Sequence, residues 1–173
     1  MRKYVNTDQE YVLKLVRQNV GENTDHFVNN ISTPSIKTRN TKRNSKAPTM
    51  RKSDDAVGNV FIRPLDWETS DLASLYKDLD VDHLDLVISC DCIYNEALVE
   101  PLATTMRDIC QLASENSRPT VVVVAQQLRS PDVLEAWFNA FCKYFHVYRI
   151  PDIELDEGLR EDSGYTVHVG IVR

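Results

Sequence analysis

Two nearly continuous apolar runs, separated by an amphipathic stretch, constrain the fold of this 173-residue chain most strongly. The runs are Leu84–Asp91 and Thr120–Ala125, and both are typical of strands buried on both faces of a parallel sheet. Between them, Glu96–Ala113 repeats apolar side chains at the spacing of one helix face. Strand, helix and strand in this order form a βαβ unit, so we expect an α/β fold.

The segments before this unit predict two more strands. Tyr4–Asp8 has the character of a short strand, and Gln9–Val20 has helical spacing. Val60–Leu65 predicts a second strand, which a polar helix follows from about Ser70. These elements extend the same strand–helix alternation toward the amino terminus.

The segments after the unit predict a helix and two closing strands. Ser130-Pro131 is a favourable helix start, with serine as the cap and proline as the first helical residue. Phe145–Ile150 and Tyr165–Val172 read as strands, and only an acidic, turn-rich linker separates them. Because this linker needs no helical crossover, we expect these strands to pair antiparallel.

A polar segment interrupts the pattern at residues 23–58, where we predict a disordered basic insertion. Although the chain has a net charge of −6, Ile31–Ser53 holds seven Lys or Arg residues and no acid. Such a segment is either a nuclear-import or nucleic-acid-binding patch or a solvated loop. We expect nucleic-acid contact only through this insertion, and no membrane contact, since no apolar run reaches the length of a span.

Four cysteines lack the spacing of a secreted disulfide framework, which favours a reducing compartment, the cytoplasm or the nucleus. Cys90 and Cys92 lie on one face of a strand. No second Cys or His pair stands at ligand spacing, so we expect no metal site.

Polar residues at the carboxyl ends of the predicted strands are the candidate site residues, because ligands of open parallel sheets bind there. They are Asp8, Asp66-Trp67, Asp91 and Gln126-Gln127. Asp8 can accept hydrogen bonds from ribose hydroxyls or can cap the following helix. Trp67 can stack on a purine or can anchor a loop.

These landmarks, in this order, resemble methyltransferase family 16, the seven-β-strand lysine protein methyltransferases. Thr7-Asp8-Gln9, Leu65-Asp66-Trp67 and Gly164–His168 look like family segments, as does Ala125–Arg129. Asp91-Cys92-Ile93-Tyr94 matches the family's Asp-x-x-Tyr motif after its fourth strand. Within the family, the chain looks most like the fungal ribosomal lysine N-methyltransferases.

The resemblance implies a Rossmann-like sheet, S-adenosylmethionine as the cofactor and a protein substrate, a ribosomal protein being one expected target. It implies that Asp8 binds the ribose, that Trp67 lies beside the adenine and that Cys90 lines the cofactor pocket. Asp91 and Tyr94 would face the target lysine. A carboxylate orients an amine by hydrogen bonding, and an aromatic ring stabilises a nearby cation.

The family pattern begins with an earlier strand and a glycine-rich loop, and only seven residues precede Asp8. We therefore expect residues 1–173 to form a partial methyltransferase domain, an inactive fragment being one reading. The alternative is a non-enzymatic interaction protein that keeps the scaffold. A nicotinamide-binding domain is a third reading, which the Asp-x-x-Tyr motif and the closing strand pair disfavour.

Overall fold

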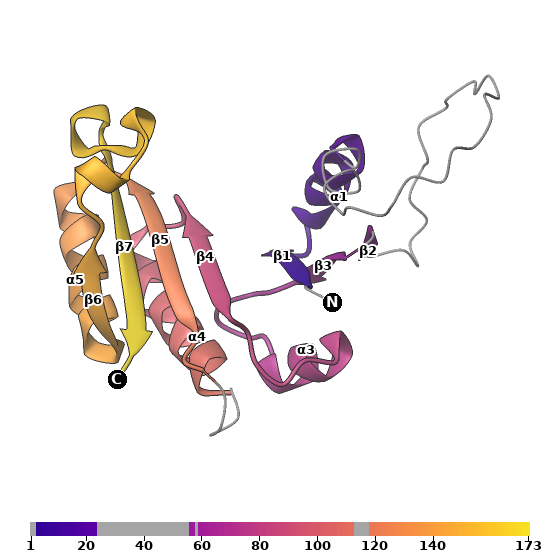
Figure 1. Ribbon diagram of the computed structural model, residues 1–173. Coiled ribbons are helices and arrows are strands. Elements are labelled where there is room, and N and C mark those ends of the chain that lie inside the picture. The colour runs from indigo at the N-terminus through magenta and orange to yellow at the C-terminus, as the bar shows by residue number, and fades with distance from the viewer. Residues whose placement is uncertain (1–2, 24–55, 58, 113–117) are drawn as a thin grey trace, which may run out of the picture. The chain divides into compact units, whose positions relative to one another are not determined.

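A computed structural model describes residues 3–23, 56–57, 59–112 and 118–173. The chain divides into two compact units, Met1–Asp66 and Trp67–Arg173. The described strands form two separate sheets, one in each unit, and helices accompany both (Figure 1). The α/β class predicted from the sequence is therefore confirmed.

The first unit contains a small mixed sheet and one helix. Strand β1 (Tyr4–Asp8) runs parallel to β3 (Val60–Pro64), and the two-residue strand β2 (Ala56–Val57) pairs antiparallel with the other edge of β3. Helix α1 (Leu13–Glu22) contributes Leu13 and Val20 to a core that includes Val60 and Ile62. Helical spacing of apolar residues in α1 is what brings these side chains onto the sheet.

The insertion predicted at residues 23–58 lies mostly outside the described residues. Its carboxyl end is an exception, because Ala56 and Val57 pair with Phe61 and Val60 of β3. The prediction of disorder is therefore wrong at these two positions, which pair with β3, and at Asn23, whose N–H donates to the carbonyl of Asn19 at the end of α1.

The second unit is built on a four-stranded sheet in the order β4-β5-β7-β6. Its elements are α3 (Leu72–Leu79), β4 (Leu86–Cys90), the 3-10 turn η1 (Glu96–Leu98), α4 (Val99–Gln111), β5 (Val121–Gln127), α5 (Pro131–Tyr144), β6 (Phe145–Arg149), three 3-10 turns (Asp152–Glu154, Glu157–Leu159, Glu161–Ser163) and β7 (Tyr165–Val172). Strands β4 and β5 are parallel, whereas β7 lies antiparallel between β5 and β6. The predicted βαβ unit and the closing antiparallel pair are both confirmed.

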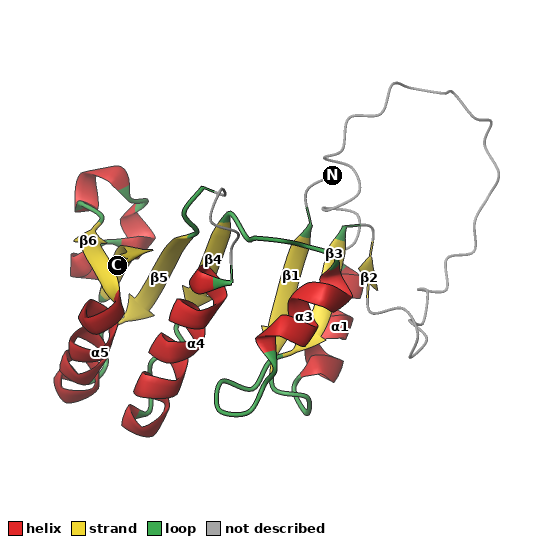
Figure 2. Ribbon diagram, turned by 90° about the horizontal axis from the view of Figure 1, so that it is seen from below, coloured by secondary structure: helices red, strands yellow, loops and turns green. Residues whose placement is uncertain are grey.

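Helices α4 and α5 cover one face of this sheet (Figure 2). Their apolar stripes meet the inward side chains of the strands in a single core, which includes Val122 and Val124 of β5. At its centre Trp137 stacks on Phe141, with ring centroids 4.7 Å apart, and Phe141 contacts Phe145 at 4.6 Å. Among the described residues, no helix combines the length and the apolar character that a membrane crossing requires.

Two local predictions need correction. Strand β4 was expected to be buried on both faces, but Leu86 is 48% and Ile88 61% exposed, because only the alternate residues Val87 and Ser89 point toward the helical layer. Ser130 does precede α5 in an extended conformation, yet its side chain makes no capping hydrogen bond. Proline at the first helical position lacks an N–H, which leaves one donor fewer to cap.

Candidate functional site

The candidate site of the second unit lies where β4 and β5 end side by side. Asp91 directly follows β4, and its N–H donates to the carbonyl of Ala125 at 2.8 Å, which continues the ladder by one step. Asp91 has a φ of 55°. Positive φ is uncommon outside glycine but is tolerated by aspartate, and such conformations often mark functional turns. The chain turns sharply here and carries the next residues away from the sheet.

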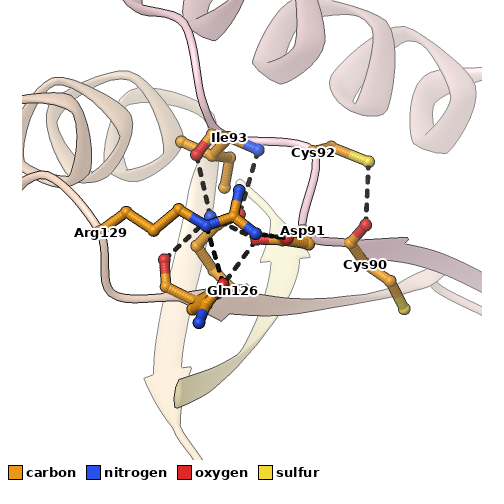
Figure 3. Close-up of polar contacts among 7 residues, drawn as sticks. Cys90, Asp91, Cys92, Ile93, Gln126 and Arg129 are labelled. Atoms are coloured by element: carbon orange, nitrogen blue, oxygen red, sulfur yellow. Dashed lines mark hydrogen bonds and ion pairs between the residues drawn. The ribbon is translucent and has the colours of Figure 1, made fainter. Parts of the chain in front are cut away.

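Gln126 holds this turn from the neighbouring strand. The residue is only 3% exposed, and its Oε1 accepts a hydrogen bond from the N–H of Ile93 at 3.0 Å. Its Nε2 lies 2.9 Å from the carbonyl oxygen of Ile93 and 3.0 Å from Oδ1 of Asp91 (Figure 3). A buried amide is stable only when its donors and acceptor are used, so Gln126 and the Asp91–Ile93 turn depend on one another.

The two carboxylate oxygens of Asp91 have different partners. Oδ1 accepts from Gln126 Nε2 and from the N–H of Gln127 at 3.3 Å, so it is tied to the sheet. Oδ2 forms an ion pair with Nη2 of Arg129, a residue that follows β5. Nε of Arg129 also donates to Oε1 of Gln127 at 2.7 Å. The carboxylate thus has one structural oxygen and one that faces a half-exposed guanidinium.

Tyr94 lies three residues after Asp91 and is 63% exposed. It borders a small open hollow whose lining also includes Ile93, Gln126 and Arg129, together with residues at the start of α5. The structure therefore brings Tyr94 to one hollow with Gln126 and Arg129, the two residues that contact the carboxylate of Asp91. An aromatic ring close to a carboxylate and its partners suits a cationic or amine ligand.

Cys90 and Trp67, predicted to contact a cofactor, also belong to the second unit. Cys90 is the last residue of β4, and its thiol is free and exposed. Trp67 is partly buried against the core, and its carbonyl accepts from Oγ1 of Thr105 at 3.0 Å. These contacts agree with the anchoring role considered for Trp67, and its place beside an adenine stays a prediction.

Asp8, the predicted ribose ligand, lies at the end of β1 in the first unit. Its Oδ1 accepts from the N–H of Gln9 at 2.8 Å, and the side chain is exposed. Asp8 does not cap α1, which begins at Leu13 after Val12. The alternative that Asp8 caps the following helix is therefore wrong.

Gln126 and Arg129 have roles that sequence reasoning did not assign. Gln126 was a candidate only because it ends a strand, and Arg129 only because Ala125–Arg129 looks like a family segment. Their partner Asp91 lies 35 and 38 residues earlier in the chain, respectively. No local spacing encodes such contacts, although two consecutive glutamines ending an apolar strand are a signal for a polar network.

Comparison with known proteins gives consistent matches. A family model described as lysine methyltransferase matches residues 49–141. Ribosomal lysine N-methyltransferase 5 of Lachancea thermotolerans is 25% identical over 161 residues, which cover 90% of this chain and 46% of that protein. The protein of the same name from Candida glabrata is 31% identical over 151 residues, covering 79% and 41%. The chain thus spans about half the length of the curated relatives it matches.

The fold also has a counterpart among solved structures. The crystal structure of the CurJ carbon methyltransferase aligns with 98% of this chain and 41% of its own, with a TM-score of 0.51. Sequence identity is 12%, so the similarity concerns the fold alone. The Rossmann-like methyltransferase fold expected from the resemblance is therefore confirmed.

Proposed function

The chain belongs to the lysine methyltransferase family, and on that premise we propose that it transfers a methyl group from S-adenosylmethionine to a lysine of a protein. Its relatives' names make a ribosomal protein the first candidate substrate. We take residues 1–173 as part of one methyltransferase domain. The arrangement of Asp91 carries the proposal, because one oxygen is fixed by the sheet and the other pairs with Arg129, which lines the same hollow as Tyr94.

The residues present fit a cofactor of this kind. Asp8 is an exposed carboxylate at a strand end, as hydrogen bonding to ribose hydroxyls requires. Within the second unit, Cys90 ends β4 with an exposed thiol and Trp67 is a partly buried aromatic side chain, and both remain our proposed cofactor contacts. When bound, S-adenosylmethionine supplies an electrophilic methyl group on a sulfonium.

The task of the chain's own residues is to present a neutral amine in line with that methyl group. Asp91 orients the amine by accepting a hydrogen bond at Oδ2, while its Oδ1 remains tied to Gln126. Tyr94 offers its ring to the positive charge that develops on the nitrogen as the methyl group arrives. We also propose a cytoplasmic or nuclear setting for this reaction, because the spacing of the four cysteines in the sequence is not that of a secreted disulfide framework.

The test is a methyl-transfer assay on isolated ribosomal proteins, with modified lysines identified by mass spectrometry. We expect Asp91→Ala and Tyr94→Ala to lower the rate about 100-fold while cofactor affinity stays nearly unchanged, since each removes one positioned group. Asp8→Ala is expected to weaken S-adenosylmethionine binding in calorimetry.

Tyr148→Ala is the matched control for Tyr94→Ala, because Tyr148 is 60% exposed but lies on β6. It is expected to leave the rate unchanged. Normal turnover in both the Asp91 and the Tyr94 variants, in folded protein, would refute the assignment of these two residues to the target lysine.

A further inference from the structure

The ion pair between Asp91 and Arg129 raises a question about how a target amine reaches the site. Oδ1 of Asp91 already accepts from Gln126 Nε2 at 3.0 Å and from the N–H of Gln127 at 3.3 Å. Both donors belong to the end of β5, so this oxygen is already used by the sheet. Among the described residues Oδ2 has one hydrogen-bond partner, Arg129, so Oδ2 is the oxygen that we expect a ligand amine to use.

Arg129 is placed so that its guanidinium can release Oδ2 of Asp91. Its side chain is 52% exposed, compared with 37% for Asp91, and it borders the same hollow as Tyr94. Nε of Arg129 is held by Oε1 of Gln127 at 2.7 Å, independently of Nη2, which binds Asp91. The guanidinium can release Oδ2 while Gln127 keeps the side chain near the opening, because the two bonds use different nitrogen atoms.

We propose that Arg129 is a positioning residue that holds Oδ2 of Asp91 until the amine of the target side chain replaces its guanidinium. The proposal rests on the proposed function, since it assigns to Asp91 the part of the lysine acceptor. Arg129 acts in two opposing ways. It keeps the carboxylate in one orientation, which favours turnover, and it competes with the incoming lysine side chain for the same oxygen, which weakens binding.

This double action predicts a split between binding and turnover. Arg129→Gln removes the competitor, and an exposed ion pair of this kind corresponds to about a two- to five-fold change in affinity. We therefore expect the variant to bind a lysine side chain about two- to five-fold more tightly, while kcat falls because Oδ2 is less well oriented. Arg129→Lys keeps the positive charge but has only one nitrogen for Gln127 and Asp91, so we expect it to restore the competition for Oδ2 without restoring kcat in full.

The binding arm needs no catalysis. Nα-acetyl-lysine methylamide is titrated into the full chain while the side-chain carboxyl signal of Asp91 is followed by NMR. Tighter binding to Arg129→Gln than to wild type supports the proposal. Equal affinity, or no binding to either protein, overturns it. Asp91→Asn lacks this carboxyl signal, so its binding is measured by titration calorimetry, where we expect no binding, and thermal melts verify that each variant is folded.

Arg149→Gln is the matched control, because Arg149 is 46% exposed and forms ion pairs with Asp152 and Glu161 instead of Asp91. If it tightens binding as much as Arg129→Gln does, a general charge effect explains the result and the proposal fails.

The second arm measures KM and kcat for methyl transfer to ribosomal proteins. If the lysine ligand displaces Arg129 from Asp91 but no methyl transfer is detected, the proposed function alone is refuted. Methyl transfer with unchanged KM and kcat in Arg129→Gln would refute the role of Arg129 alone.

Discussion

Gly170 of β7 gives a direct test of how tightly the layers of the second unit pack. A Cβ atom at this position would lie 2.5 Å from Cζ of Phe141 and 3.2 Å from Cε1. The ring has little room to retreat, because Phe141 is 0% exposed and lies between Trp137 and Phe145. To lengthen this contact to an ordinary carbon–carbon distance near 3.5 Å, the backbone at Gly170 or the Phe141 ring must shift by about 1 Å in a close-packed core.

We expect Gly170→Ala to lower the free energy of unfolding by about 1–3 kcal/mol, the usual cost of overpacking a core. A less flexible unfolded chain offsets this only in part, by about 0.4–1 kcal/mol. The measurement is urea unfolding followed by tryptophan fluorescence. Both tryptophans of the chain, Trp67 and Trp137, belong to the second unit, so the signal reports on that unit.

Two variants make the reasoning refutable. Gly158→Ala is the control, because no heavy atom would lie within 4 Å of its Cβ, and we expect it to change stability little. Phe141→Leu should relieve the clash, so the double variant should be more stable than the sum of the two single effects by about 0.5 kcal/mol or more. Additive effects, or a Gly170→Ala cost equal to that of Gly158→Ala, would contradict the packing argument.

Two further predictions concern titrating groups of the second unit. Burial raises the pKa of Cys110 to about 11, so native protein treated with iodoacetamide at pH 8 should be alkylated at exposed Cys142 well before Cys110, as peptide mass spectrometry can check. Similar rates at the two thiols would contradict this. Burial, and to a lesser extent Arg149, lowers the pKa of His168 below 6.5. The unfolded state therefore takes up a proton that the folded state resists, and stability should fall below pH 6.5 by at most about 1.4 kcal/mol per pH unit. His168→Phe, which keeps an aromatic ring against Phe138, should lose less stability than wild type between pH 7 and 5 in urea titrations; an equal loss would count against the linkage.

The sequence by itself determined the elements of the chain and their order. Continuous β-branched runs and amphipathic spacing are local properties, and they placed β4, α4 and β5 within a few residues of their observed bounds. The turn-rich acidic linker before Tyr165 was enough to predict the antiparallel pair of β6 and β7. Strand ends also marked Asp8, Asp91 and Gln126 as candidates, because their position relative to an apolar run can be read directly.

Only the tertiary structure decided the place of β7 in the sheet and the hydrogen-bond partners of the candidate site residues. Nothing local indicates that β7 lies between β5 and β6, or that Gly170 must leave space for Phe141. The exposed side chains of Leu86 and Ile88 contradict what their apolar character predicts, because a run of residues does not state what covers it.

The division of Asp91 into a structural and an outward-facing oxygen has the same origin. Its partners Gln126 and Arg129 come from a strand end 35 and 38 residues later, and only the parallel pairing of β4 with β5 brings these groups within hydrogen-bonding distance. Burial then forces Gln126 to satisfy its amide on the Asp91–Ile93 turn. Polar partners over such separations depend on which strands are neighbours, and that is a property of the folded chain.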